Sequence, residues 1–225
     1  MTAFVFDLDG TLVDSVYHHV LAWHEALRDD GIELSVWRIH RKIGMSGGLL
    51  ANALLRETGR PVSDQDAVRL RRAHADGYAR HLPNIRPLPG AVDLLRRLTE
   101  LDVRWAIATS GHIESAGPTL ELLELPDGVP VITRDRVRWA KPDPDLFLAA
   151  IEQLDVAAED AVVVGDSVWD LLAAQRARAL GVGLLTGGYG EDELQRAGAY
   201  RVYVDPADML AHLDEVGVRP PLDGA

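Results

Sequence analysis

The sequence predicts an α/β fold: a parallel sheet with helices on both faces, interrupted by one all-helical insertion. Two observations lead to this prediction. Short apolar runs of strand length alternate with stretches of helical periodicity, and the segment from about residue 15 to residue 83 breaks that alternation. Strands that alternate with helices imply right-handed crossovers and therefore a parallel sheet.

Five apolar runs rich in β-branched residues supply the expected central strands. They are Ala3–Phe6, Arg104–Ala108, Val129–Ile132, Ala161–Val164 and Val182–Leu185, and Val202–Val204 could add an edge strand. Helical periodicity covers Gly90–Leu101, Pro144–Leu154 and Val168–Ala179 between them. This order is typical of a Rossmann-like core with helices on both faces.

The insertion contains helical patterns and no strand pattern. Val16, Val20, Trp23 and Leu27 recur at helical spacing behind a candidate N-cap, Ser15, and two further stretches, Leu49–Leu55 and Ala67–Tyr78, also look helical. Prolines near residues 83–89 suit a linker that returns to the sheet. We therefore expect a core of residues 1–14 and 84–225 and a helical cap of residues 15–83.

Composition narrows the function. The formal charge of −12 argues against nucleic acid and anionic membranes as partners, because both require a basic surface. The chain has no cysteine, and its apolar start is too short for a signal peptide, so we expect a cytoplasmic protein. We expect a monomer or a weak homodimer.

The first polar motif, Asp7 to Asp14, directly follows the first predicted strand. Asp7 and Asp9 stand at i and i+2 and can face one ligand. A hard cation on Asp7 would screen its repulsion from a phosphate, so that Asp7 can attack as a nucleophile. Asp9 is then placed to act as general acid and base. Taken alone, the motif is also compatible with an ordinary polar turn.

Two further motifs offer groups for an anion. Thr109, Ser110 and Gly111 follow the second predicted strand and lead into a helix, where a hydroxyl and free N–H groups can bind phosphate. Lys141 lies in a proline-stiffened Lys-Pro-Asp-Pro segment and can neutralise negative charge. A helix cap and a solvated lysine are the ordinary alternatives.

A fourth motif completes the set. Asp166 follows the predicted strand Ala161–Val164 and can complete a magnesium site with Asp7, while Ser167 and Asp170 open the next helix. Asp170 can brace Lys141 or a metal-bound water. Ligands of open α/β sheets bind at the carboxyl ends of the strands, so the four motifs are expected to meet in one crevice.

The sequence resembles the haloacid dehalogenase-like (HAD) superfamily, in the group with a helical cap that contains phosphoglycolate phosphatases and β-phosphoglucomutases. Four motifs of this superfamily are matched in order. The matching residues are the first motif described above, then Thr109, then Lys141-Pro142, and finally Gly165-Asp166-Ser167 together with Asp170. The resemblance implies a nucleophile at Asp7, an acid/base at Asp9, and Thr109 and Lys141 on the phosphate. It also implies magnesium on Asp7, Asp166 and the Asp9 carbonyl.

Within this family the residues favour a phosphatase acting on a small phosphorylated metabolite such as a phosphosugar or phosphoglycolate. Asp9 argues against the dehalogenases, in which this aspartate is absent. His19 and Trp23 resemble a pair found in β-phosphoglucomutases, but Gly47, Gly111 and Ile113 stand where a mutase binds its second phosphate. A mutase and an inactive binding protein remain the alternatives.

The cap contributes candidate substrate contacts. These are His19 in its first helix and Lys42, Gly44 and Met45 in a loop expected to face the core. Lys42 is the one lysine besides Lys141, and a solvated lysine is its ordinary alternative. Such loops vary within one fold, so the substrate itself cannot be predicted from the sequence.

Overall fold

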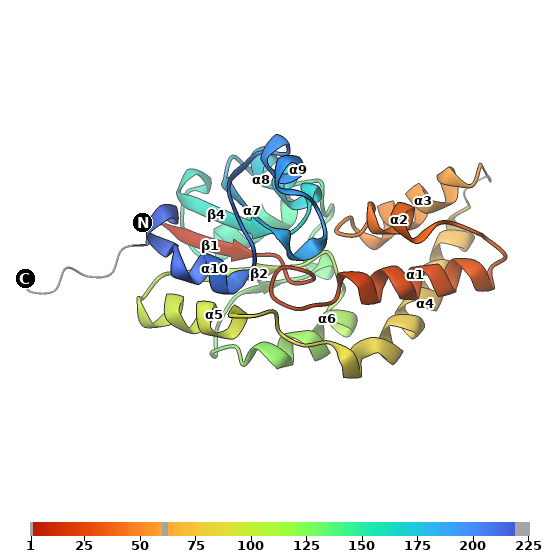
Figure 1. Ribbon diagram of the computed structural model, residues 1–225, viewed down its shortest axis with the longest axis horizontal. Coiled ribbons are helices and arrows are strands. Elements are labelled where there is room, and N and C mark those ends of the chain that lie inside the picture. The colour runs from red at the N-terminus through yellow and green to blue at the C-terminus, as the bar shows by residue number, and fades with distance from the viewer. Residues whose placement is uncertain (1, 60–62, 219–225) are drawn as a thin grey trace, which may run out of the picture.

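A computed structural model, which describes residues 2–59 and 63–218, contains a six-stranded parallel sheet in the order β3-β2-β1-β4-β5-β6 (Figure 1). The strands are β1 Ala3–Phe6, β2 Trp105–Ala108, β3 Val131–Ile132, β4 Ala161–Gly165, β5 Leu180–Leu184 and β6 Ala199–Tyr203. The chain order reverses on either side of β1. Ligand sites of open α/β sheets form at such a switch point, outside the carboxyl ends of the strands.

Alternate residues of the buried strands face the two layers of helices. Phe4 and Phe6 of β1 pack in a cluster with residues of α5 (Ala91–Glu100), α6 (Ile113–Leu120) and α10 (Pro206–Ala211). Ala3 and Val5 pack on the opposite face with α7 (Asp145–Gln153) and α8 (Val168–Ala177). A further helix, α9 (Glu191–Arg196), packs near β5 and β6. The predicted α/β core with helices on both faces is confirmed.

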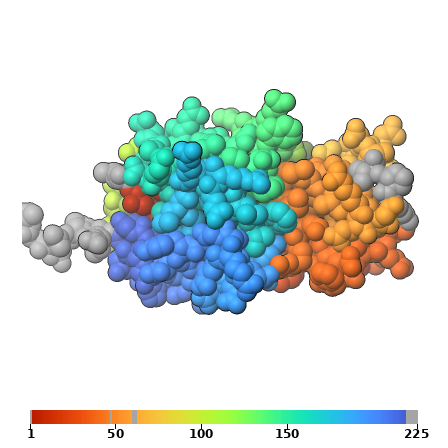
Figure 2. Space-filling model, turned by 90° about the horizontal axis from the view of Figure 1, so that it is seen from above, coloured from red at the N-terminus to blue at the C-terminus, as the bar shows by residue number. Residues whose placement is uncertain are grey.

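In its described residues, the inserted segment consists of four helices that lie beyond the strand ends (Figure 1). The segment occupies one end of the molecule (Figure 2). The helices are α1 Val16–Asp29, α2 Val36–His40, α3 Gly47–Glu57 and α4 Asp64–His81. A hydrophobic cluster of their own joins α1 to the other three helices. Helices and no strand occupy the described part of the insertion, while the exact domain boundaries stay a prediction. No helix in the described parts of the chain is long and apolar enough to span a membrane.

The structure corrects several predicted elements. Strand β5 starts at Leu180 rather than Val182, because Leu180 and Gly181 pair with Val162 and Val163 of β4. Strand β3 is limited to Val131–Ile132, since Pro130 has no N–H for the ladder. The edge strand β6 begins at Ala199 and ends before Val204. Most residues of β6 are exposed or only partly buried, so the apolar run Val202–Val204 did not mark where this strand begins and ends. The short helices α2, α9 and α10 were not predicted.

Candidate active site

Three strand ends carry the polar residues of the first, second and fourth motifs to one edge of the sheet. Asp7 follows β1, Thr109 follows β2 and Asp166 follows β4. The parallel register pairs Phe6 with both Ile107 and Val164, so the next residues of the three strands also lie at similar heights. The Asp7 N–H donates to the Val164 carbonyl oxygen at 2.9 Å. The predicted meeting of these motifs is therefore present in the structure.

Lys141 reaches this edge from the loop after β3 and lies between two carboxylates. Its Nζ atom is 2.5 Å from Asp7 Oδ1 and 2.8 Å from Asp170 Oδ1. All three side chains are almost completely buried, with Lys141 only 1% exposed. A buried ammonium requires such partners, since an unpaired charge away from water is costly. Lys141 is thus a fixed positive charge beside Asp7.

Asp170 is held in place by the first turn of α8. Its Oδ2 atom accepts hydrogen bonds from the Ser167 N–H at 3.0 Å and the Ser167 hydroxyl at 2.5 Å, while Oδ1 faces Lys141. A Cβ atom on Gly165 would lie 2.3 Å from the Asp170 Cβ atom, so glycine is required there. Because both Asp170 oxygens are engaged, we interpret this residue as the brace of Lys141.

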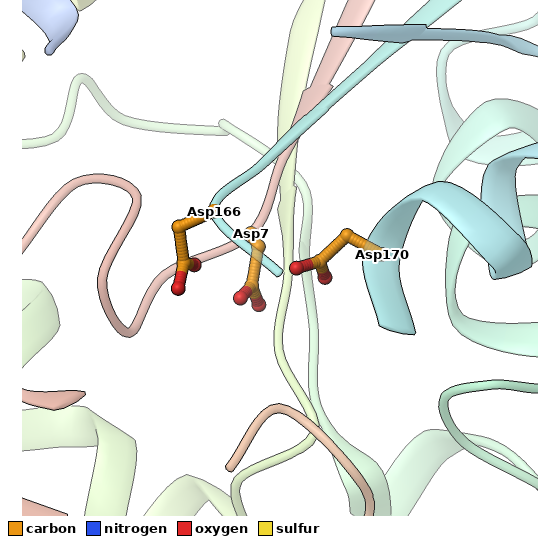
Figure 3. Close-up of side chains that lie close together, drawn as sticks. All are labelled: Asp7, Asp166 and Asp170. Carbon is orange, nitrogen blue, oxygen red and sulfur yellow. The ribbon is translucent and has the colours of Figure 1, made fainter. Parts of the chain in front are cut away.

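Asp166 lies on the side of Asp7 opposite Asp170 (Figure 3). Two small residues, Thr11 and Gly187, lie against its carboxylate. Asp7, Asp166 and Asp170 each offer an oxygen within 4.8 Å of the others (Figure 3). The Thr11 hydroxyl donates to Asp166 Oδ1 at 2.9 Å. A Cβ atom on Gly187 would lie 1.9 Å from Asp166 Oδ2, so the loop after β5 can approach this carboxylate only with glycine.

The electrostatics of this cluster show an excess of buried negative charge. Burial raises the pKa of Asp7 to about 7, although Lys141 lowers it, and the nearby Asp170 adds to the rise. Burial and the carboxylates of Asp170 and Asp7 hold the pKa of Asp166 well above its usual range. Burial alone would lower the pKa of Lys141, but its two carboxylate partners raise it. One lysine therefore does not compensate three carboxylates.

The donor set fits a divalent metal ion. Asp7 and Asp166 offer hard carboxylate oxygens, which are the protein ligands preferred by magnesium, and magnesium needs only one or two of them. A bound cation would also offset the excess negative charge that raises both pKa values. Asp170 is less available as a ligand, because its oxygens already accept hydrogen bonds from Lys141 and Ser167.

Asp9 faces the cap rather than the acidic cluster. Its Oδ1 atom lies 3.2 Å from His19 Nε2 and accepts a hydrogen bond from the Ser15 hydroxyl at 2.7 Å. Burial alone would raise the pKa of Asp9, but His19 and Ser15 outweigh it and lower the pKa. Ser15 does occupy the N-cap position of α1, yet its side chain does not cap the helix, contrary to the expectation. It binds Asp9 instead.

Sequence reasoning missed the residues behind His19. His74 Nε2 lies 3.1 Å from His19 Nδ1, and the His74 ring stacks on Trp23 with centroids 4.3 Å apart. Tyr78 stacks on His19 at 3.8 Å. Burial and the nearby His19 hold the pKa of His74 well below its usual range. The available signal was the i, i+4 spacing of His19 and Trp23 in α1 and of His74 and Tyr78 in α4, which places each pair on one helix face.

A cavity of about 360 Å³ lies between the cap and the sheet edge and contains the candidate residues of both. Asp7, Asp9, Thr109, Ser110, Gly111 and Lys141 line it from the core, and His19, Gly44 and Met45 line it from the cap. Lys42 is not among the lining residues. Its ammonium pairs with Glu57 Oε1 at 2.9 Å, a contact within the cap.

The residues expected to bind phosphate are partly engaged with one another. The Gly111 N–H donates to Thr109 Oγ1 at 3.0 Å, so this donor must change partner to bind a ligand. The Ser110 hydroxyl lies 3.4 Å from the Gly44 carbonyl oxygen and links the core to the cap loop. Gly44 itself has φ +94°, and a Cβ there would lie 2.7 Å from Ser167 Oγ. The loop and the core are therefore in close contact.

This fold and this cluster of residues define a class of protein. A family model described as haloacid dehalogenase-like hydrolase matches residues 1–178, and the chain belongs to this family. The fold is shared closely with a solved structure described as a hydrolase from Pseudomonas syringae. It is 53% identical, with a TM-score of 0.94, and the alignment covers 97% of this chain and all of that one.

Relatives similar in sequence are named for several activities. The chain is 34% identical over 166 residues to hexitol phosphatase A of Escherichia coli, covering 73% of this chain and 74% of the relative. It is 30% identical over 214 residues to phosphoglycolate phosphatase of Rhodospirillum rubrum, covering 92% and 88%. It is also 27% identical over 219 residues to β-phosphoglucomutase of Bacillus subtilis, covering 95% and 93%.

Proposed function

We propose that this protein is a magnesium-dependent phosphatase that hydrolyses a small phosphorylated metabolite through a phosphorylated Asp7. The observation that carries the proposal is the position of Asp7. Its carboxylate lines the cavity, is held by Lys141 at 2.5 Å and stands beside Asp166 in a metal-compatible cluster. Such an arrangement favours attack by a carboxylate on an electrophile that carries negative charge.

In the first step an Asp7 oxygen forms a bond to phosphorus while the bond from phosphorus to the ester oxygen breaks. Asp9, in its protonated form, gives its proton to the departing oxygen, which leaves as an alcohol. Lys141 and Thr109 stabilise the phosphoryl oxygens from the core side of the cavity. The role of Asp9 is supported by its position at the cap side of Asp7, next to His19.

In the second step Asp9, now ionised, takes a proton from a water molecule, whose oxygen forms the new bond to phosphorus. The bond between phosphorus and Asp7 breaks, which releases phosphate, restores the Asp7 carboxylate and leaves Asp9 protonated for the next turnover. A magnesium ion held by Asp7, Asp166 and the Asp9 carbonyl would supply charge neutralisation between Asp7 and the phosphate. The cap can exclude further water from the cavity during the first step.

The proposal is tested by phosphate release from para-nitrophenyl phosphate and from a panel of phosphorylated sugars, polyols and glycolate. We expect release in the presence of magnesium and transient labelling of Asp7 by acid-quenched mass spectrometry. Absence of release from all esters, with the metal bound, would support an inactive binding protein instead. Release without labelling would contradict the covalent route.

A second candidate is a phosphomutase, which the contact between His19 and Asp9 favours. A histidine that orients Asp9 only when the cap is closed would slow attack by water and give a sugar hydroxyl time to act as acceptor. We expect β-glucose 1-phosphate with catalytic glucose 1,6-bisphosphate to give inorganic phosphate or nothing. Glucose 6-phosphate formed at more than about 1 s⁻¹, in a coupled dehydrogenase assay, would assign the mutase activity instead.

A further inference from the structure

Two arginines of the cap line the cavity, and the proposed chemistry does not use either of them. Arg71 and Arg72 lie in α4, on the side of the cavity away from the strand ends. Arg71 is partly buried and Arg72 is exposed. They were not recognised from the sequence, because nothing in a helix pattern tells which of its arginines faces a neighbouring domain.

Neither guanidinium has an acidic partner in the described parts of the chain. Arg71 Nε donates to the Ala67 carbonyl oxygen at 3.2 Å, and within the described residues no hydrogen bond or ion pair engages its terminal Nη groups. Other arginines of α4 differ: Arg69 pairs with Asp30 and Asp66, and Arg80 pairs with Glu25. In a chain with a net charge of −12, cations left without carboxylates beside a cavity suit an anionic ligand.

The rest of the cap wall is largely apolar. Trp23, Ile43, Met45, Leu50, Val68 and Ala75 line it together with the arginines, and the other polar side chains of this wall, His19, His74 and Tyr78, form one stacked group in which His19 contacts Asp9. The apolar side chains between that group and the arginines offer almost no partners for the hydroxyl groups of a polyol, and an unpaired hydroxyl buried among them would be unfavourable. The wall therefore suits a ligand whose polar groups lie at its two ends. The cavity volume equals that of about a dozen water molecules, which is more than phosphoglycolate requires.

We infer that Arg71 and Arg72 bind a second anionic group, a carboxylate or a phosphate, on the substrate. The inference rests on the proposed function and specifies its substrate class: phosphomonoesters of acids, or bisphosphates, larger than phosphoglycolate. The reacting phosphate lies at the core end beside Asp7, and the second anion lies at the cap end. Arginine is suited to this role because its planar group can donate two hydrogen bonds to one carboxylate or phosphate.

The test compares esters of matched skeleton. 3-Phosphoglycerate is compared with glycerol 3-phosphate, 6-phosphogluconate with glucose 6-phosphate, and fructose 1,6-bisphosphate with fructose 6-phosphate. We expect kcat/KM to be at least about tenfold higher for the doubly anionic member of one or more pairs, as one charge-assisted contact provides. The first two pairs report a carboxylate and the third reports a phosphate.

Variants then show which residues cause the preference for the doubly anionic ester. Arg71→Ala and Arg72→Ala should each reduce the preference for the doubly anionic ester about tenfold, mainly through KM, and Arg71→Lys should restore part of it. Arg69→Ala is the matched control on the same helix and should leave the preference unchanged, because Arg69 does not line the cavity. An equal loss on both members of each pair, or the same loss in the control, would contradict the inference.

Failure of the inference and failure of the proposed function give different results. If the wild-type protein releases phosphate but prefers the neutral esters or neither class, the phosphatase assignment stands and the role of the arginines is wrong. If nothing is hydrolysed, ligand-induced thermal stabilisation by the same pairs replaces turnover as the measurement. Equal stabilisation by both members would then overturn the inference, and a selective shift lost in Arg71→Ala would support it.

Discussion

His19 of the cap and Asp9 of the core are in direct contact, with His19 Nε2 lying 3.2 Å from Asp9 Oδ1. The contact joins α1 to the loop after β1, and His74 supports it from behind, 3.1 Å from the other ring nitrogen. A change in the position of the cap therefore acts on the proposed acid/base through His19. The orientation of Asp9 and the closure of the cavity are coupled.

The first prediction concerns this contact. His19→Gln should lower kcat about 10- to 100-fold with a smaller change in KM, because Asp9 loses the partner that orients it. Steady-state kinetics with para-nitrophenyl phosphate measure the effect. His24→Ala, in the same helix and outside the cavity lining, is the control. Wild-type kcat in His19→Gln would show that Asp9 is oriented by other groups.

The second prediction separates activity from stability at Asp7. Asp7→Asn should abolish phosphate release, because an amide cannot serve as the nucleophile. Activity within tenfold of wild type would exclude the covalent route. The same variant should be at least as stable as wild type in EDTA at pH 8. Asp7 has a pKa of about 7, so its buried carboxylate is ionised unfavourably there, and the amide resembles the neutral acid. Thermal unfolding measures this part.

A third prediction addresses the metal. EDTA should remove activity, and magnesium should restore it, whereas calcium should not, because calcium accepts more ligands in looser geometry. Magnesium should also raise the melting temperature of the wild-type protein by binding only its folded state. Asp166→Asn should weaken both effects. Equal rates with calcium would argue against a site built from two buried carboxylates.

The fourth prediction uses the glycine that borders Asp166. In Gly187→Ala the new Cβ would meet Asp166 Oδ2 at 1.9 Å, so either the loop or the carboxylate must move. We expect at least about a tenfold higher magnesium concentration for half-maximal activity, as for loss of a supporting metal contact. Gly117→Ala, where a Cβ meets nothing within 4 Å, is the control and should behave like wild type. Titration of activity with magnesium distinguishes them.

The fifth prediction is a pH dependence of stability from His74. Its pKa is well below 6.5 in the folded protein, so on acidification the unfolded chain binds a proton that the folded protein does not. Stability should therefore fall as pH decreases below 6.5, by up to about 2 kcal/mol at pH 5. Asp7 acts in the opposite direction over this range, so the comparison is with His74→Gln. Parallel curves of unfolding free energy for the two proteins would disprove the assignment to His74.

The sequence by itself determined the α/β class, the helical nature of the insertion and the grouping of Asp7, Thr109 and Asp166. These predictions succeeded because they rest on local information. A residue that directly follows a buried parallel strand is placed at the sheet edge by the strand itself, whatever the rest of the chain does. Lys141 also reached this edge as expected, from the loop that joins β3 to α7.

Only the tertiary structure decided how the cap completes the cavity. Helical periodicity shows which face of α1 is apolar, but not that this face packs on α4, some fifty residues later, so His74 and the two arginines could not be assigned. The same limit applies to Lys42, whose position in a loop did not reveal its pairing with Glu57. Contacts between segments distant in sequence depend on side-chain packing of the whole domain, which no short motif encodes.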